Sequence, residues 1–317
     1  MNRRTFLSVT AGVAGLAANM PSSIIPVIDT HIHLFDPHRP QGIPWPDKSD
    51  TVLYHAALPE RYRKVTRGLG VVGAIEVECS PWLEDNQWVL DVAARDTMIV
   101  GTIGDLEPGN SEFASQLERF HRNPLFRGIR YGNLWGRSLS KQLSNPQFVD
   151  GLKRVAEADL VMDTANPDPE LIAAVLRLSD QVPRLRIVID HLPQMEWPAS
   201  APDRAALNAN LQQLGKRPQV YVKVSEVLKR PNGRLQQDLG YYKALLDQLW
   251  DTFGADRLVY GSDWPNCDHI ETVGQELKLV RQYFMGKGHE ASEKYFWKNS
   301  VAAYRWVKRA PDQPQLA

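Results

Sequence analysis

Two histidines separated by one residue follow an apolar run near the start of the chain. The run IIPVIDT spans residues 24–30, and His31 and His33 come directly after it. Residues two apart in an extended chain point to the same face, so two imidazoles would emerge side by side where a strand ends. Neutral imidazoles are common ligands for zinc and similar metals. The pair predicts half of a metal site, with a pair of histidines that binds nothing as the alternative.

Two more residues follow apolar runs in the same way. His191 ends the segment LRIVIDH, and Asp263 ends RLVYGSD. We interpret Asp263 as a metal ligand and as the general base that takes a proton from water, with a helix N-cap as the alternative. We interpret His191 as a catalytic group that polarises a substrate carbonyl or as a further ligand, with a histidine satisfied by a backbone carbonyl as the alternative.

Cations interrupt two other apolar runs. Arg130 lies in FRGIRYG and Lys223 in VYVKVS. A guanidinium grips carboxylate or lactone oxygens through its fork of donors, so we predict that Arg130 binds substrate and that Lys223 does the same. Structural ion pairing is the alternative for both residues.

Two glutamates and a tryptophan belong to one further segment. Glu76 and Glu78 alternate with apolar residues in AIEVECS, and Trp82 follows soon after. We expect the apolar residues to pack on outer helices and the glutamates to face the interior, where an unpaired charge is costly. Glu78 is then a substrate or metal contact, or the ion-pair partner of a strand cation, and Trp82 is a substrate contact or a packing residue.

Short β-rich runs alternate with longer helical patterns from residue 24 onward, which indicates βα units and a parallel sheet. Eight such runs in about 290 residues predict an α/β fold, a (β/α)8 TIM-type barrel, with a doubly wound open sheet as the alternative. The segment at 291–306 predicts an extra C-terminal helix. The runs are IIPVIDT, VVGAIEVECS, MIVGTIGDL, FRGIRYG, LVMDTA, LRIVIDH, VYVKVS and RLVYGSD.

The first residues have the pattern of an export signal. Arg3 and Arg4 precede an apolar and small-residue run from Phe6 to Ala18. That run is shorter than the roughly 20 residues needed to span a bilayer, and its paired arginines resemble a twin-arginine signal. We therefore predict a signal peptide at residues 1–20, a single barrel domain at 21–317, and a periplasmic or secreted protein without a stable membrane anchor.

The charge composition indicates which class of binding partner to expect. Lys plus Arg and Asp plus Glu both total 37, so the formal net charge is zero. A nucleic-acid partner would need a concentrated basic face, so we expect a small-molecule substrate and no nucleic acid. The chain contains only two cysteines, Cys79 and Cys267, and we expect both to be free. No feature of the sequence specifies an oligomeric state.

Five segments together carry a family resemblance. THIHLFDP, FRGIRYG, IVIDHLP, VYVKVS and YGSDWP, in this order, resemble the amidohydrolase-related lactonase branch of the amidohydrolase superfamily. The resemblance spans residues 24 to about 308. It implies a metal-supporting (β/α)8 barrel that hydrolyses esters, lactones or amides.

The resemblance also implies roles for individual residues. It makes His31 and His33 the strand 1 pair, His191 the strand 6 histidine and Asp263 the strand 8 aspartate. Asp163 and Arg130 stand where many members carry a histidine and some a bridging lysine, so one divalent metal, zinc or manganese, is expected rather than two. Some members of the branch act without a metal, and metal-independent action is the alternative.

These inferences together predict a hydrolase that opens a sugar lactone or related cyclic ester. A metal, or the two histidines acting directly, polarises the carbonyl, and Asp263 activates water. Two alternatives remain at this point. One is a metal-dependent decarboxylase on the same barrel, and the other is a solute-binding relative without catalysis.

Overall fold

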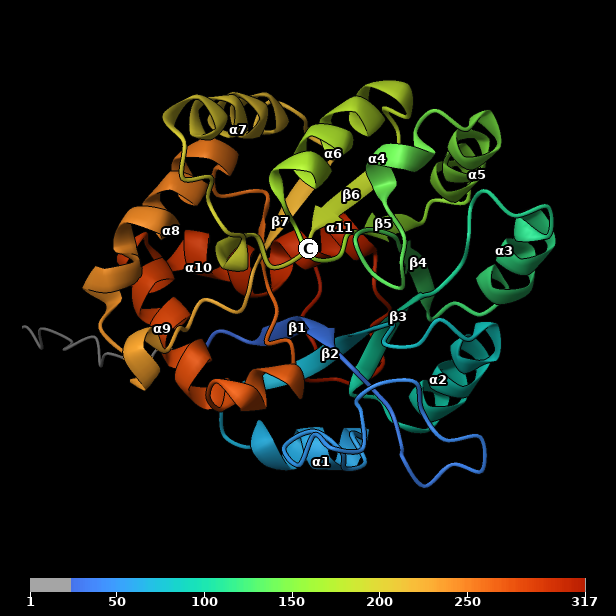
Figure 1. Cartoon of the computed structure of the whole chain (residues 1–317). Coiled ribbons are helices and arrows are strands. Elements are labelled where there is room, and N and C mark those ends of the chain that lie inside the picture. The colour runs from blue at the N-terminus through green and yellow to red at the C-terminus, as the bar shows by residue number, and fades with distance from the viewer. Residues whose placement is uncertain (1–23, 317) are drawn as a thin grey trace, which may run out of the picture.

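The computed structural model describes residues 24–316. The predicted signal peptide, residues 1–20, lies outside the described residues. Eight strands form one parallel sheet in the order of the chain, which confirms the predicted (β/α)8 barrel (Figure 1). The strands are β1 (Val27–Ile32), β2 (Val71–Val77), β3 (Ile99–Gly104), β4 (Phe126–Arg130), β5 (Val161–Asp163), β6 (Arg186–Ile189), β7 (Val220–Val224) and β8 (Leu258–Tyr260).

The barrel closes where β1 meets the segment that follows β8. The Asp263 amide donates to the His31 carbonyl at 2.9 Å, and the His33 amide donates to the Trp264 carbonyl at 2.7 Å. These two hydrogen bonds bring the ends of the first and last strands together. They therefore join the His-x-His segment to the aspartate that was predicted to work with it.

Helices surround the strands in an outer ring (Figure 1). Pro59, Pro146, Pro169 and Pro202 stand in the first turns of their helices, where a missing N–H costs no hydrogen bond. The helices are α1 (Pro59–Val65), α2 (Leu83–Arg95), α3 (Phe113–His121), α4 (Leu139–Gln142), α5 (Pro146–Glu157), α6 (Pro169–Gln181), α7 (Ala201–Leu214), α8 (Leu239–Phe253), α9 (Val273–Gly286), α10 (His289–Glu293) and α11 (Asn299–Tyr304).

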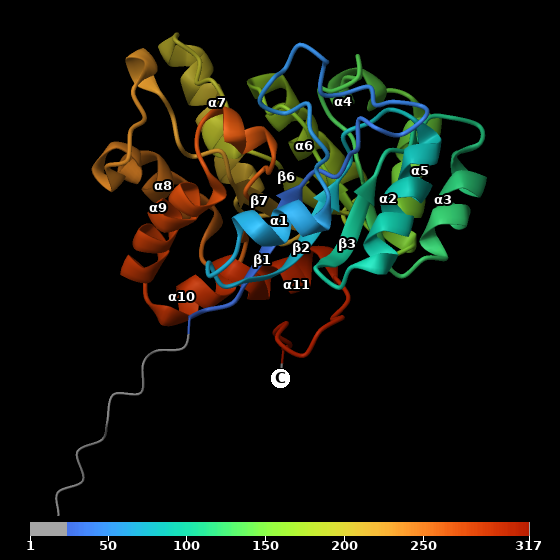
Figure 2. The same ribbon diagram turned by 90° about the horizontal axis from the view of Figure 1, so that it is seen from below.

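The extra C-terminal segment closes one end of the barrel. It consists of α10, one π-helical turn (Lys294–Lys298) and α11, rather than the single helix expected from the sequence. Tyr304 and Trp306 pack into the apolar cluster inside the barrel. In Figure 2, α11 lies at one end of the strands and the blue loop after β1 runs over the other end. The end of the barrel opposite α11 is therefore the end over which the loop after β1 runs.

The interior of the barrel corrects the facing predicted for strand β2. Ile75 and Val77 belong to the inner cluster, together with Ile28 of β1 and Val259 of β8. Glu76 therefore points outward, into a space between the barrel and α2. Its side chain is 1 % exposed, and burial raises its pKa well above the usual range. The prediction that the glutamates of this strand face the interior is wrong for Glu76.

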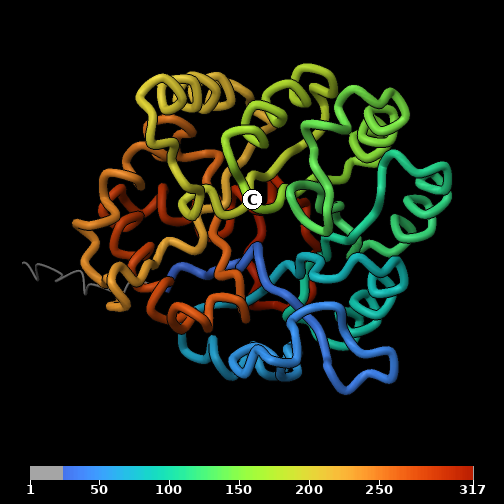
Figure 3. Tube along the Cα trace, in the orientation of Figure 1, coloured from blue at the N-terminus to red at the C-terminus, as the bar shows by residue number. Residues whose placement is uncertain are grey.

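Two further expectations can be compared with residues 24–316. Within that range, no helix is both long and apolar enough to cross a bilayer. Cys79 and Cys267 are both buried and free, which confirms the prediction for the two thiols. The loop after β1 reaches α1, and its course is followed most easily in the tube of Figure 3.

Candidate active site

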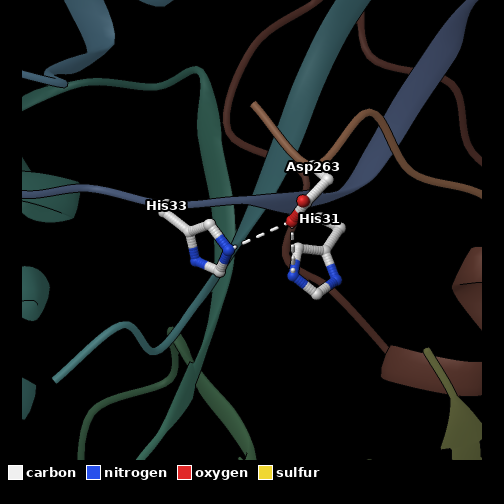
Figure 4. A group of neighbouring side chains, drawn as sticks. All are labelled: His31, His33 and Asp263. Carbon is white, nitrogen blue, oxygen red and sulfur yellow. Dashed lines mark hydrogen bonds and ion pairs between the residues drawn. The ribbon is translucent and has the colours of Figure 1, made fainter. Parts of the chain in front are cut away.

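Four of the predicted residues meet at the open end of the barrel. His31 ends β1, His33 follows it, His191 follows β6 and Asp263 follows β8. The Nε2 atoms of the three imidazoles lie 3.3, 3.1 and 3.6 Å from one oxygen, Oδ1 of Asp263. Figure 4 shows two of these imidazoles on either side of the carboxylate. The structure thus brings these four side chains together around one atom.

The orientation of His33 follows from its second nitrogen. Nδ1 lies 2.7 Å from the carbonyl oxygen of Val77. A carbonyl oxygen only accepts, so Nδ1 carries the hydrogen and donates it. The Nε2 atom of a neutral His33 is then left with a lone pair that points at Asp263. Two electron-rich atoms 3.1 Å apart are stabilised when a cation or a proton lies between them.

Asp263 is held as a carboxylate. Its Oδ2 accepts a 2.6 Å hydrogen bond from Nδ2 of Asn266. Burial opposes its charge, but the neighbouring imidazoles of His191, His33 and His31 act in the opposite direction and outweigh burial, so the pKa of Asp263 lies well below its usual range. Its backbone adopts a φ of 60°, which is uncommon outside glycine and is often found at functional sites. An ionised carboxylate in this position can accept a proton from water.

His191 is a neutral imidazole. Its Nδ1 lies 2.8 Å from Oγ of Ser225, which fixes the ring. Burial lowers the pKa of His191 to about 4, although Asp263 and Asp190 act in the opposite direction. Like Asp263, it has a positive φ, 51°.

A cavity of about 730 Å³ opens above these residues. Arg130 lines it, as predicted, and its Nε also donates to the Thr164 carbonyl at 3.0 Å. Both aromatic and amide side chains line the cavity. Its walls include Trp45, Leu134, Trp135, Asn166, Gln194, Glu226 and Asn266.

Two predicted substrate contacts lie elsewhere. Lys223 is fully buried beneath the cavity, where Nζ lies 2.9 Å from Asp163 and 2.7 Å from Asp190. The prediction that Lys223 contacts substrate is therefore wrong, and the alternative of structural ion pairing is the one observed. Trp82 directly precedes α2, is 39 % exposed and is not among the residues that line the cavity. Its contact with substrate stays a prediction.

Glu78 has an indirect place at the site. It does not line the cavity, but its Oε2 accepts a 3.1 Å hydrogen bond from Nε1 of Trp135, which does. Burial raises the pKa of Glu78 to about 7, against the lowering effect of Arg130. The residue therefore supports a cavity wall instead of contacting substrate directly.

Two residues at the site were not predicted from the sequence. Glu226 follows β7, lies 3.5 Å from Nδ1 of His191 and lines the cavity. Asn266 holds Asp263, as described above. Glu226 comes two residues after a strand end, and Asn266 three residues after Asp263. Both positions are signals that a search of the loops after the strands could have used.

The donor set suits a divalent metal. Metal bonds of 2.0–2.2 Å in a tetrahedral site separate neighbouring ligand atoms by roughly 3.4 Å. The Nε2 atoms of His31 and His33 lie at comparable distances from Asp263, and the Nε2 atom of His31 has no hydrogen-bond partner. His31, His33 and Asp263 could hold one ion together. His191, Glu226 and Asp263 form a second possible set.

Comparison with known proteins assigns the chain to a family. The Amidohydrolase family model matches residues 28–306. The chain belongs to the amidohydrolase family. Its barrel and strand-end residues agree with that membership, and the predicted family is confirmed.

The individual proteins that resemble this chain share 28 % of its residues or fewer. The chain is 28 % identical over 299 residues to an L-fucono-1,5-lactonase of Burkholderia ambifaria, a match that covers 90 % of this chain and 98 % of the relative. An amidohydrolase of Burkholderia multivorans solved with bound zinc has a TM-score of 0.75 at 20 % identity, over 89 % of this chain and 99 % of that one. A probable 2-pyrone-4,6-dicarboxylic acid hydrolase of Acinetobacter baumannii has a TM-score of 0.68 at 18 % identity, over 88 % and 99 %. These structural similarities show the same barrel fold.

Proposed function

We propose that this amidohydrolase opens the ring of a sugar-acid lactone with water. The observation that carries the proposal is the ionised Asp263 carboxylate with three imidazoles around it, at the floor of a cavity. The Burkholderia ambifaria relative, an L-fucono-1,5-lactonase, supports a 1,5-lactone of a sugar acid as substrate. The cavity walls fit such a ring, because Trp45 and Trp135 offer apolar faces while Asn166 and Gln194 offer groups that bond hydroxyls.

Each of three residues has its own role in the hydrolysis. Asp263 accepts a proton from a water molecule as the water oxygen forms a bond to the lactone carbonyl carbon. Arg130 and the imidazole of His191 stabilise the negative charge that develops on the carbonyl oxygen. The bond from that carbon to the ring oxygen then breaks, and Asp263 returns the proton to the leaving oxygen. The product is an open-chain hydroxy acid.

We propose zinc or manganese as the metal of this site. The nitrogen and oxygen donors of His31, His33 and Asp263 support this choice, as does the zinc bound to the Burkholderia multivorans protein. A bound divalent metal would polarise the carbonyl and lower the pKa of water toward 7. The roles given above to Asp263, Arg130 and His191 do not depend on which metal binds.

A lactone screen tests the proposal. Purified protein is offered 1,5-lactones and 1,4-lactones of sugar acids, and ring opening is followed by proton release above the spontaneous rate. The same samples are assayed for metal content and then after chelation. Turnover of sugar lactones supports the proposal. Release of CO2 from an aromatic carboxylate, with no lactone turnover, would support the decarboxylase alternative.

We also infer that the protein is exported by a twin-arginine signal. The support is the sequence MNRRTFL, in which Arg3 and Arg4 precede an apolar run. Replacing both residues with lysine should retain the protein in the cytoplasm in a fractionation experiment. Unchanged export of the double variant would contradict the inference.

A further inference from the structure

A buried ammonium group lies directly behind one of the site imidazoles. Nζ of Lys223 is 3.0 Å from Nδ1 of His31, on the side of the ring that faces away from the cavity. Both side chains are fully buried. Lys223 was assigned no contact with substrate above, and its direct contact with the site imidazoles is this one with His31.

Lys223 lies between two carboxylates. Nζ donates to Oδ2 of Asp163 at 2.9 Å and forms an ion pair of 2.7 Å with Oδ1 of Asp190. Both carboxylates thus face the ammonium group. An ammonium has three hydrogens and no lone pair, so it can only donate. Nδ1 of His31 must therefore accept.

A glycine leaves the space that the contact between Lys223 and His31 needs. Gly261 follows β8, and a Cβ atom at that position would lie 2.9 Å from Cβ of His31 and 2.9 Å from Cδ of Lys223. No larger residue fits without displacing one of the two side chains. The close approach of Lys223 and His31 thus depends on a glycine in the neighbouring chain segment.

A different arrangement of hydrogens is less favourable. Nδ1 of His31 also lies 3.5 Å from Oδ2 of Asp190, to which it could donate if it carried a hydrogen. That hydrogen would then face the ammonium of Lys223, which is closer. The other oxygen of Asp190 already pairs with Lys223, and Oδ2 lies 3.4 Å from Nε of Arg130.

From these contacts we propose that Lys223 is a positioning residue that fixes His31 in the tautomer with hydrogen on Nε2. A neutral ring whose Nδ1 accepts from Lys223 carries its hydrogen on the nitrogen that faces the cavity floor. His31 then carries its hydrogen on Nε2, which lies 3.3 Å from Oδ1 of Asp263, and this hydrogen must move before Nε2 can ligate a metal. His33 has the opposite tautomer, because its Nδ1 donates to the Val77 carbonyl.

The consequence is a site that resists metal binding at one of its two predicted strand 1 ligands. For His31 to ligate through Nε2, its hydrogen must move to Nδ1 and face the ammonium. Lys223 therefore weakens metal affinity, and in the metal-free state it places the N–H of His31 beside Oδ1 of Asp263. The catalytic meaning of this donor rests on the proposed lactone hydrolysis, whereas the tautomer itself is measured without turnover.

The first test is the tautomer in the wild-type protein. Metal-free protein labelled with ¹⁵N-histidine is examined by two-bond ¹⁵N–¹H correlation, which distinguishes the two neutral forms. The signals are assigned by their loss in His31→Asn and His33→Asn. We expect hydrogen on Nε2 of His31 and on Nδ1 of His33, so that the two rings serve as references for each other. Hydrogen on Nδ1 of His31, or a mixture of forms, would overturn the proposal.

The second test is zinc affinity, measured by competition with a chromogenic chelator. The variant Lys223→Met with Asp163→Asn removes one buried charge of each sign and is compared with Asp163→Asn alone, which keeps the contact to His31. We expect zinc to bind the double variant about 10- to 100-fold more tightly, the range typical of changes behind a metal ligand. Equal or weaker binding would overturn the proposal.

The two tests separate this inference from the proposed function. If the double variant does not fold, the tautomer of the wild-type protein still decides. If no lactone is turned over but His31 carries its hydrogen on Nε2, the proposed function fails and the role of Lys223 stands.

Discussion

Glu276 gives the protein a stability that falls as pH rises. This residue of α9 is 3 % exposed, and its Oε1 accepts a 3.1 Å hydrogen bond from the Val227 amide. Burial, with added repulsion from Asp263 and Asp29, raises the pKa of Glu276 from 4.5 to about 8. Between those values the folded protein holds a proton that the unfolded chain has lost. The free energy of unfolding therefore decreases with increasing pH across this window.

The magnitude follows from linkage. Each pH unit in the window costs about 1.4 kcal/mol, so this one carboxyl lowers stability by about 3 kcal/mol between pH 5 and pH 7. Glu276→Gln keeps a carbonyl oxygen for the Val227 amide and cannot ionise. We expect the free energy of unfolding of the variant, relative to that of the wild type, to rise by about 3 kcal/mol as pH increases from 5 to 7.

Urea unfolding at pH 5, 6 and 7 measures the effect as a difference between the two proteins. Other buried groups titrate in this range, and their contributions cancel in that difference. Glu170→Gln, at an exposed position in α6, is the matched control and should leave the difference independent of pH. A wild-type minus Glu276→Gln difference that stays constant from pH 5 to pH 7 would refute the reasoning.

Two further predictions concern the cavity. Asn266→Ala removes the 2.6 Å donor to Asp263, so kcat should fall by about 10- to 100-fold with little change in KM; an unchanged kcat in steady-state lactone hydrolysis would contradict the role of Asn266. Trp135→Ala removes an apolar wall, so KM for a sugar lactone should rise by about tenfold, equivalent to about 1.4 kcal/mol, and kcat should change less. If the Trp135 variant lost only kcat, Trp135 would not act in substrate binding.

The arrangement of the main site residues could be predicted from the sequence. Alternating strand and helix patterns require a parallel barrel, and a parallel barrel brings the ends of all strands to one rim. His31, His191 and Asp263 each follow an apolar run directly, so their meeting follows from topology alone. The distances between them do not, since these depend on where each strand stops.

The facing of strand β2 could not be read from its alternation. Both faces of a barrel strand are buried, one by the inner cluster and one by helices, so apolar residues mark neither face as inner. Ile75 and Val77 fill the inner cluster, and Glu76 points toward α2. The position of Lys223 below the cavity could not be predicted either, because a cation in a strand can point into the cavity or lie beneath it.

The sequence also did not predict which loop residues reach the site. Glu226 and Asn266 reach the site through the conformations of the segments after β7 and β8. Trp82 follows a strand of the same barrel and yet lies away from the cavity. Distance from a strand end along the sequence therefore does not decide which loop side chains face the substrate.

The central claim is that Asp263 activates water for lactone opening, and one comparison tests it most directly. Steady-state hydrolysis of a sugar-acid 1,5-lactone is measured for wild type, Asp263→Asn and Asp268→Asn. Asp268 lies in the short 3-10 helical turn that follows Asp263, Asn266–His269, where it pairs with Arg61 at 3.0 Å and does not line the cavity. We predict that kcat falls by about 10²- to 10⁴-fold in Asp263→Asn and is kept in Asp268→Asn. A folded Asp263→Asn protein with wild-type kcat would contradict the account.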